Sequence, residues 1–169
     1  MSGDRVTLLV TGLELLDPSI RTIDSAVHEL VCEAKDEIII VAYLLTEAAL
    51  GIIDQLRKSA ERGVKITVLI NSLEHQERTV IERLKLLVKY RNVRILSFSD
   101  PRGGHLHAKV ILADRRKAVI GSANLSWGGM VTNYEVGVLI EGETAWKLAT
   151  AIDRLIMIKG VRCIASDIE

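Results

Sequence analysis

The sequence HLHAKVILADRRKAVIGSANLS, residues 105–126, combines two apolar runs with several polar side chains. The runs at 107–113 and 118–120 flank a short polar segment, 114–117, of the kind that joins two antiparallel strands. The stretch therefore predicts a β-hairpin. It also raises the question of why two histidines, a lysine, a serine and an asparagine lie in what otherwise resembles the buried centre of a sheet.

Upstream of this hairpin, strand-like and helix-like patterns alternate along the chain. Runs rich in Val, Ile and Leu are separated by stretches in which apolar residues recur at helical spacing. Such alternation is typical of a largely parallel sheet covered by helices. We expect strands at 5–16, 37–44, 64–70 and 93–98, and helices at 19–35, 46–62 and 75–90.

Downstream of the hairpin, the pattern predicts one more strand at 134–140 and a closing helix at 144–158. The composition, 49% hydrophobic and 26% charged, is that of a globular domain. The sequence contains no Pro/Ser-rich linker and no internal repeat. We therefore expect one α/β domain over residues 1–169, with a mixed, largely parallel sheet and helices on both faces.

Charge is unevenly distributed, although the formal net charge is zero. Residues 71–120, which include the hairpin, hold 11 basic and 5 acidic side chains. A local positive field favours a partner that carries phosphate. For residues 78–94 alone, a solvated basic helix face is the better interpretation.

The sequence indicates a cytoplasmic protein without integral membrane association. The first residues do not have the pattern of a signal peptide. No stretch approaches the roughly 18 uninterrupted apolar residues of a membrane span. The two cysteines, Cys32 and Cys163, lie in neither a metal-like nor a CxxC spacing, so they suggest neither a metal site nor a disulfide framework.

The polar residues of the hairpin suit a phosphate. Residues i and i+2 of a strand face the same way, so His107 and Lys109 are expected to share a face. Glycine at 121 allows close approach of a ligand, and Ser122 and Asn124 offer short hydrogen-bond donors. A polar cluster satisfied within the sheet is the alternative, but it would have to explain five polar residues at once.

The spacing of His107-x-Lys109, Asp114 and Gly121-Ser122-x-Asn124 resembles the HKD motif of the phospholipase D superfamily. The short chain with a single motif resembles the bacterial and archaeal endonuclease-like members of this superfamily. This resemblance implies an α/β/α sandwich and hydrolysis of a phosphodiester through a phosphohistidine. It also implies that neither a metal nor another cofactor is needed.

The resemblance assigns roles to individual residues. His107 would attack phosphorus or transfer a proton, while Lys109, Ser122 and Asn124 would bind phosphate oxygens and stabilise the transition state. Glu135 resembles the carboxylate that orients the nucleophilic imidazole, as in other catalytic triads.

Four further residues have weaker assignments. Asp114 and Gly121 belong to the motif and are expected to have structural roles. His105 lies at the edge of a Gly-rich loop and is a candidate for substrate contact, although the motif does not include it. Trp127 follows the motif and either lines the mouth of the site or is buried in the core.

The chemistry of the family uses two histidines from two motifs, whereas this chain has one motif. Short members of the family solve this by forming homodimers. An isologous two-fold interface brings each residue at the axis opposite its own copy. We therefore expect a homodimer with one composite active site, in which the two copies of His107 take different roles.

The motif indicates the bond that is cleaved better than the substrate. The first hypothesis is an endonuclease acting on DNA or RNA without metal, supported by the short single-motif form and the basic segment. The second is a phospholipid hydrolase acting on cardiolipin-like lipids. The third is a catalytically silent nucleic-acid-binding subunit, against which the intact motif argues.

Overall fold

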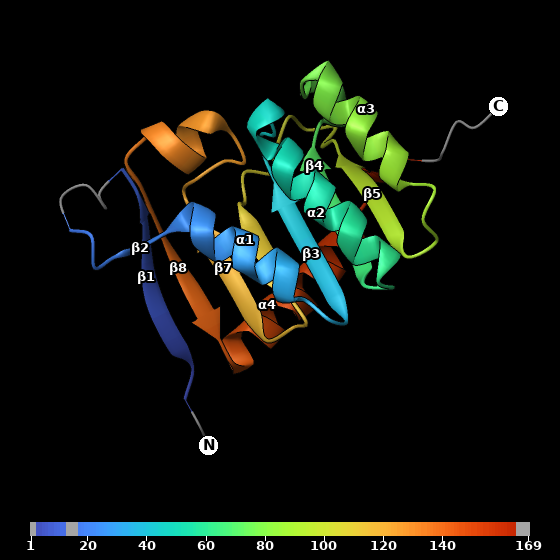
Figure 1. Ribbon diagram of the computed structural model, residues 1–169. Helices are drawn as coiled ribbons and strands as arrows, with labels where there is room; N and C mark the ends of the chain where they lie inside the picture. The colour runs from blue at the N-terminus through green and yellow to red at the C-terminus, as the bar shows by residue number, and fades with distance from the viewer. Residues whose placement is uncertain (1–2, 13–16, 165–169) are drawn as a thin grey trace.

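The computed structural model describes residues 3–12 and 17–164, which form one nine-stranded sheet with flanking helices (Figure 1). The strand order is β2-β1-β8-β7-β6-β3-β4-β5-β9. The strands are β1 Arg5–Thr11, β2 Arg21–Thr22, β3 Glu37–Ala42, β4 Lys65–Asn71, β5 Val93–Phe98, β6 Val110–Ala113, β7 Lys117–Gly121, β8 Glu135–Glu141 and β9 Val161–Cys163.

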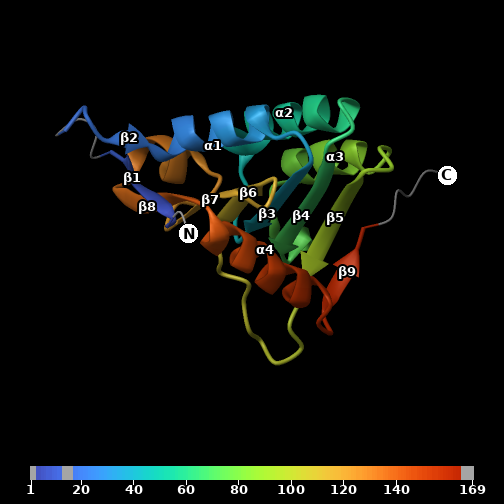
Figure 2. The ribbon, with the colours of Figure 1, turned by 90° about the horizontal axis from the view of Figure 1, so that it is seen from below.

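Helices cover both faces of the sheet (Figure 2). The helices α1 (Ile23–Glu33), α2 (Leu50–Glu61) and α3 (Arg78–Leu87) lie on one face, and α4 (Glu143–Ile156) lies on the other. Side chains of a strand alternate between the two faces. Because helices cover both faces, the central β3 is buried along its whole length. No helix in the described part of the chain is long and apolar enough to cross a bilayer.

The expected α/β fold with a mixed sheet and helices on both faces is confirmed, but the parallel part is smaller than predicted. Parallel pairing joins β3 to β4, β4 to β5, and β1 to the short β2. The other five pairings are antiparallel. The cause is that the hairpin and β8 insert between β1 and β3, while β9 adds to the far edge.

Several boundaries differ from the predicted ones. The first helix begins at Ile23 rather than at Ser19, because the Thr22 hydroxyl caps the N–H of Ser25 and the preceding residues pair with β1. The first hairpin strand begins at Val110 rather than at residue 107, because its partner β3 ends at Ala42. The predicted strand 5–16 ends at Thr11, and residues 13–16 lie outside the described part.

Other predicted helices begin or end with tighter turns. The predicted helix 46–62 starts as a 3₁₀ turn, Glu47–Ala49, before α2. The predicted helix 75–90 is shortened to α3, after a separate 3₁₀ turn at Leu73–His75. The short edge strands β2 and β9 were not predicted, because two or three residues carry no detectable alternation.

The turn of the β6–β7 hairpin is anchored by the carboxylate of Asp114. Asp114 and Arg115 have φ angles of 53° and 54°, as the central residues of a type I′ turn do, and the Arg116 N–H closes the turn on the Ala113 carbonyl at 3.0 Å. The carboxylate accepts hydrogen bonds from the backbone N–H groups of Lys35, Asp36 and Glu37 at 3.0, 2.8 and 2.9 Å. These bonds fix the hairpin against the segment that leads from α1 into β3.

Arg115 strengthens the same junction. Its guanidinium bonds the carboxylates of Glu37 on β3, at 2.6 Å, and Asp153 on α4, at 2.7 Å. The hydrogen bonds to Asp153 and Glu37 raise the pKa of Arg115, so the guanidinium is charged at neutral pH. The hairpin turn is therefore held to both the sheet and the opposite helix layer.

We predict that Asp114→Asn destabilises the fold by about 2 kcal/mol at neutral pH, because hydrogen bonds to a charged group are the strong ones. Burial alone raises the pKa of Asp114, but the backbone hydrogen bonds from Glu37, Asp36 and Lys35 outweigh it and hold the pKa below its usual value. The carboxylate therefore stabilises the protein above the pKa it has in the unfolded chain, and this contribution is lost as pH falls through the folded-state pKa. Urea unfolding of both proteins across the acidic range measures the difference.

The matched control is Asp36→Asn, which changes an exposed carboxylate in the same region and is expected to leave the free energy of unfolding within about 0.5 kcal/mol. An Asp114→Asn variant as stable as wild type at neutral pH would contradict the assignment.

Candidate active site

The predicted site residues gather at one end of the sheet, opposite the Asp114 turn. His107 and Lys109 precede β6, Ser122 and Asn124 follow β7, and Glu135 begins β8. Because β6, β7 and β8 are antiparallel neighbours, the start of β6, the end of β7 and the start of β8 lie at the same edge. The structure therefore brings all five residues to one place.

His107 and Lys109 form a cluster with Tyr43, the residue that follows β3. The Lys109 ammonium lies 3.2 Å from the ring nitrogens of His107 and donates a 2.8 Å hydrogen bond to the His107 carbonyl. The Tyr43 ring centroid is 4.6 Å from that of His107, and the ammonium lies 5.3 Å from the Tyr43 centroid. Tyr43 thus packs against the imidazole and offers a cation–π contact to the lysine.

Ser122 and Glu135 are paired across the neighbouring strands. The Ser122 hydroxyl donates to Oε2 of Glu135, and Asn133 Nδ2 donates to Oε1 at 3.0 Å. The backbone N–H of Val136 donates to the Ser122 oxygen at 3.3 Å. Among the described residues, the hydrogen bonds of Glu135 go to Ser122 and Asn133, so its role in orienting His107 stays a prediction.

The charge of Lys109 is influenced by its surroundings. Partial burial lowers the pKa of Lys109, and the negative charge of Glu135 counteracts part of this effect. The net result is a pKa below the usual value for lysine. The ammonium is thus partly desolvated, which strengthens its interaction with an anion.

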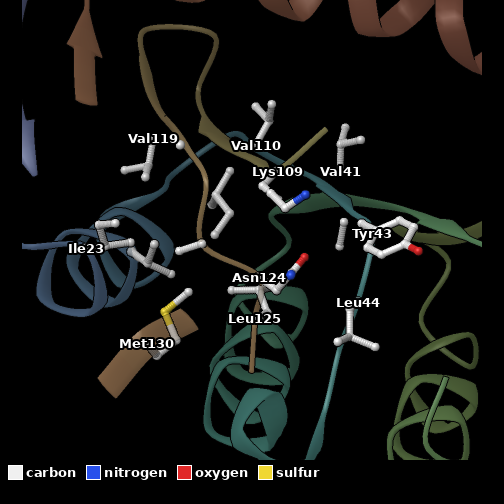
Figure 3. A pocket seen from close by; sticks show the side chains of 15 residues that line it. Ile23, Val41, Tyr43, Leu44, Lys109, Val110, Val119, Asn124, Leu125 and Met130 are labelled. Carbon is white, nitrogen blue, oxygen red and sulfur yellow. The ribbon is translucent and has the colours of Figure 1, made fainter. Parts of the chain in front are cut away.

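A small cavity of about 20 Å³ lies beside these side chains (Figure 3). Its lining is mostly apolar, and Lys109 and Asn124 point their polar ends toward the space beside Tyr43. The Asn124 Oδ1 atom is buried and has no hydrogen-bond partner among the described residues. A volume of this size accommodates one water and is too small to enclose a phosphate.

Gly121 permits the close approach of β7 and β8. A Cβ atom at this position would lie 2.8 Å from the Val136 carbonyl oxygen and 2.9 Å from Gly137 Cα. Both distances are shorter than real Cβ contacts, so a larger residue would separate the strands that carry Ser122 and Glu135.

His105 and Trp127, the two candidates for substrate contact, both lie on the surface. His105 is exposed, and its ring stands edge-on to Tyr43 at 6.3 Å. Trp127 is 63% exposed, so burial in the core is wrong for this residue. In the described part of the chain, no group of three or more His, Cys, Asp and Glu side chains is placed to hold a metal ion.

Sequence analysis missed Tyr43 and Asn133. Both flank strands, since Tyr43 follows β3 and Asn133 precedes β8. Sites in α/β sheets form beyond the carboxyl ends of strands, but the predicted strand 37–44 included Tyr43, whereas β3 ends at Ala42. Asn133 carries no comparable signal, because its contact with Glu135 depends on the local conformation of the loop.

The sequence also matches a known protein family. The family model described as "Cardiolipin synthase, PLD-like domain" matches residues 27–156. The chain therefore belongs to the phospholipase D-like family.

Individual relatives agree with this assignment. The chain is 30% identical over 129 residues to the DISARM protein DrmC of Bacillus paralicheniformis, covering 76% of this chain and 53% of DrmC. It is 27% identical over 142 residues to the virion nicking-joining enzyme of monkeypox virus, covering 83% of this chain and 31% of that enzyme. The chain thus spans about half the length of DrmC and about a third of the viral enzyme.

Solved structures share the fold over nearly whole chains. Nuc from Salmonella typhimurium, a phospholipase D family member, superposes with a TM-score of 0.77 at 21% identity, covering 97% of this chain and 100% of Nuc. NucT from Helicobacter pylori gives 0.75 at 22% identity, covering 96% and 99%.

We predict that Glu135→Gln lowers the pKa of Lys109 further. The Glu135 charge is what raises this pKa against the effect of burial, so neutralising it leaves desolvation unopposed. The pKa is measured by NMR titration of the Lys109 side chain.

Glu141→Gln, at the opposite end of β8, is the control and is expected to leave the Lys109 pKa unchanged. An unchanged or higher pKa in Glu135→Gln would show that the two side chains do not interact as described.

Proposed function

We propose that this protein is a metal-independent phosphodiesterase, and specifically an endonuclease that hydrolyses DNA or RNA through a phosphohistidine. The observation that carries the proposal is the convergence of an imidazole, an ammonium, a hydroxyl and an amide at one edge of the sheet. This set contains a nucleophile together with the donors that neutralise a phosphate.

In the first step, a ring nitrogen of one His107 attacks phosphorus. A P–N bond forms, the P–O bond to the leaving group breaks, and the leaving oxygen takes a proton from a second imidazole. Lys109, Ser122 and Asn124 bind the non-bridging oxygens, where negative charge has to be stabilised. In the second step, that second imidazole removes a proton from water, the water oxygen attacks phosphorus, and the P–N bond breaks to regenerate His107.

The second imidazole is proposed to come from another copy of the same chain in a homodimer. His107 is exposed, so it is free to approach its own copy at a two-fold axis. Three large exposed side chains, those of Trp127, Val131 and Tyr134, occupy the segment that joins Asn124 to β8. Exposed apolar side chains are typical of surfaces that a partner covers.

A nucleic acid substrate is supported by charge and by relatives. The basic segment 71–120 contains His107 and Lys109, and a positive field attracts the negatively charged phosphodiester backbone of a nucleic acid. The name of the viral nicking-joining enzyme describes breaking and rejoining of a strand.

A reducing, cytoplasmic setting fits the two cysteines, which are free and exposed.

Phospholipid is the alternative substrate class. The matching family model is named for cardiolipin synthase. Cardiolipin synthase C of Escherichia coli is 31% identical over 120 residues, covering 59% of this chain and 24% of that enzyme. A catalytically silent nucleic-acid-binding subunit is the third reading. The complete set of motif residues argues against the silent subunit. Assays with lipid test whether the protein is a phospholipid hydrolase.

The purified protein is expected to cleave nucleic acid in EDTA, and His107→Ala is expected to reduce cleavage by at least about 1,000-fold, because the nucleophile is lost. Single-stranded DNA, duplex DNA, RNA and cardiolipin-containing vesicles are assayed in parallel. A covalent phosphoprotein trapped by acid-free gel analysis identifies the intermediate.

His28→Ala removes a histidine on α1 and is the control that should retain wild-type cleavage. Release of phosphatidate without nucleic acid cleavage would replace the nuclease by the lipid hydrolase. Binding of nucleic acid without any turnover would support the silent subunit.

The composite site is tested by mixing subunits. Equal amounts of wild-type and His107→Ala chains, unfolded and refolded together, should give about a quarter of the wild-type activity if both histidines are needed, and about half if each subunit works alone. Sedimentation shows whether the active species is a dimer. Full activity of a strictly monomeric form would exclude the composite site.

A further inference from the structure

Two buried amide side chains outside the motif lie beneath the site. Asn71 is the last residue of β4 and is 6% exposed, and Gln76 follows the 3₁₀ turn after β4 and is 8% exposed. Buried amides are costly unless their donors and acceptors are used. Their partners therefore show what these side chains hold in place.

Gln76 joins the carboxyl ends of β3 and β4. Its Oε1 atom accepts a 2.8 Å hydrogen bond from the Leu45 N–H. Its Nε2 group donates to the carbonyl of Tyr43 at 3.1 Å and to the carbonyl of Asn71 at 2.9 Å. The same side chain thus fixes the backbone of Tyr43, whose ring packs on His107, and orients Asn71.

Asn71 holds the segment that carries His107. Its Oδ1 atom accepts a 2.8 Å hydrogen bond from the N–H of Leu106, the residue between His105 and His107. Residues 105–108 lie outside every strand, so ladder hydrogen bonds do not fix their position, whereas the Lys109 carbonyl accepts a 3.4 Å hydrogen bond from the Gly121 N–H. The bond from Asn71, together with burial of the Leu106 side chain, takes over this function.

The other half of the motif is connected to the same amide. Leu45, which Gln76 holds, forms an isolated parallel bridge with Leu125. The N–H of Thr46 donates to the Leu125 carbonyl at 3.1 Å. Leu125 directly follows Asn124, so Gln76 is linked to both the histidine half and the asparagine half of the phosphate site.

We propose that Asn71 and Gln76 are positioning residues, which set His107 and Asn124 in register for the reaction. This inference rests on the proposed phosphodiesterase function. Neither amide reaches the phosphate site itself, and both act through the backbone of residues that flank it. Displacing a reacting group by about 1 Å can cost a hundredfold in rate, so a support of this kind affects turnover more than substrate binding.

The test compares Asn71→Ala and Gln76→Leu with Asn92→Ala in the full chain. Asn92 is a matched control at the other end of the sheet, where its Nδ2 group donates to the carbonyls of Ala60 and Val64 at 2.9 and 2.8 Å. Asn71→Asp keeps an acceptor for the Leu106 N–H and serves as the conservative variant. Thermal unfolding shows that each variant is folded at the assay temperature.

We expect Asn71→Ala and Gln76→Leu to lower kcat by about ten- to a hundredfold while KM changes by less than about twofold. Asn92→Ala should lower Tm by a similar amount with kcat within about twofold of wild type, and Asn71→Asp should recover most of kcat. Equal effects of Asn71→Ala and Asn92→Ala on kcat would overturn the proposal.

A second measurement needs no substrate. Amide hydrogen exchange at Leu106 should accelerate at least about tenfold in Asn71→Ala, and at Leu45 in Gln76→Leu, but at neither in Asn92→Ala. Unchanged exchange at these amides would overturn the positioning role. If wild type cleaves no phosphodiester, the proposed function fails, and the exchange rates still decide whether these amides hold the segments.

Discussion

Three backbone N–H groups donate to the carboxylate of Asp114. This carboxylate lies in the turn of the β6–β7 hairpin, and the candidate site lies at the opposite end of the same hairpin. These bonds lock the turn against the start of β3 and thereby set the register of β6, from Ile38 opposite Ala113 to Val41 opposite Val110. A shift of one residue would turn every side chain of a strand to the other face. Lys109 would then leave the cavity that it now lines, so the chemistry of the site depends on an anchor at the opposite end of the sheet.

The mixed sheet explains why one edge collects so many functional groups. The parallel strands β3 and β4 deliver Tyr43 and Asn71 at their carboxyl ends, as parallel strands do in α/β proteins. The antiparallel hairpin inserted beside β3 then brings its own ends to the same edge. Because the central strands are buried on both faces, these groups rest on a rigid base, which is what a precise site requires.

The sequence predicts this architecture well where the signal is local. The strand at 93–98 has the predicted bounds, and the polar turn at 114–117 joins antiparallel strands as expected. The sequence does not predict how many strand pairings are parallel, because strand order depends on pairing between distant segments. Nothing in the sequence singles out Asn71, which follows the predicted strand 64–70, or Gln76, which falls in the predicted helix 75–90. The contact of Asn71 with Leu106 spans 35 positions, so no local pattern reveals it.

In the isolated chain, the polar groups of the site bond to one another. The Lys109 ammonium donates to the carbonyl of His107, and the Ser122 hydroxyl donates to Glu135. A phosphate that binds here has to take over these donors, and the groups it displaces have to find water or a partner. His107 and Ser122 are exposed, so the displaced bonds are readily replaced by water and the net cost of each exchange is small. In the proposed mechanism, release of Glu135 from Ser122 would also free a carboxylate for the imidazole, and this would link phosphate binding to the orientation of the nucleophile.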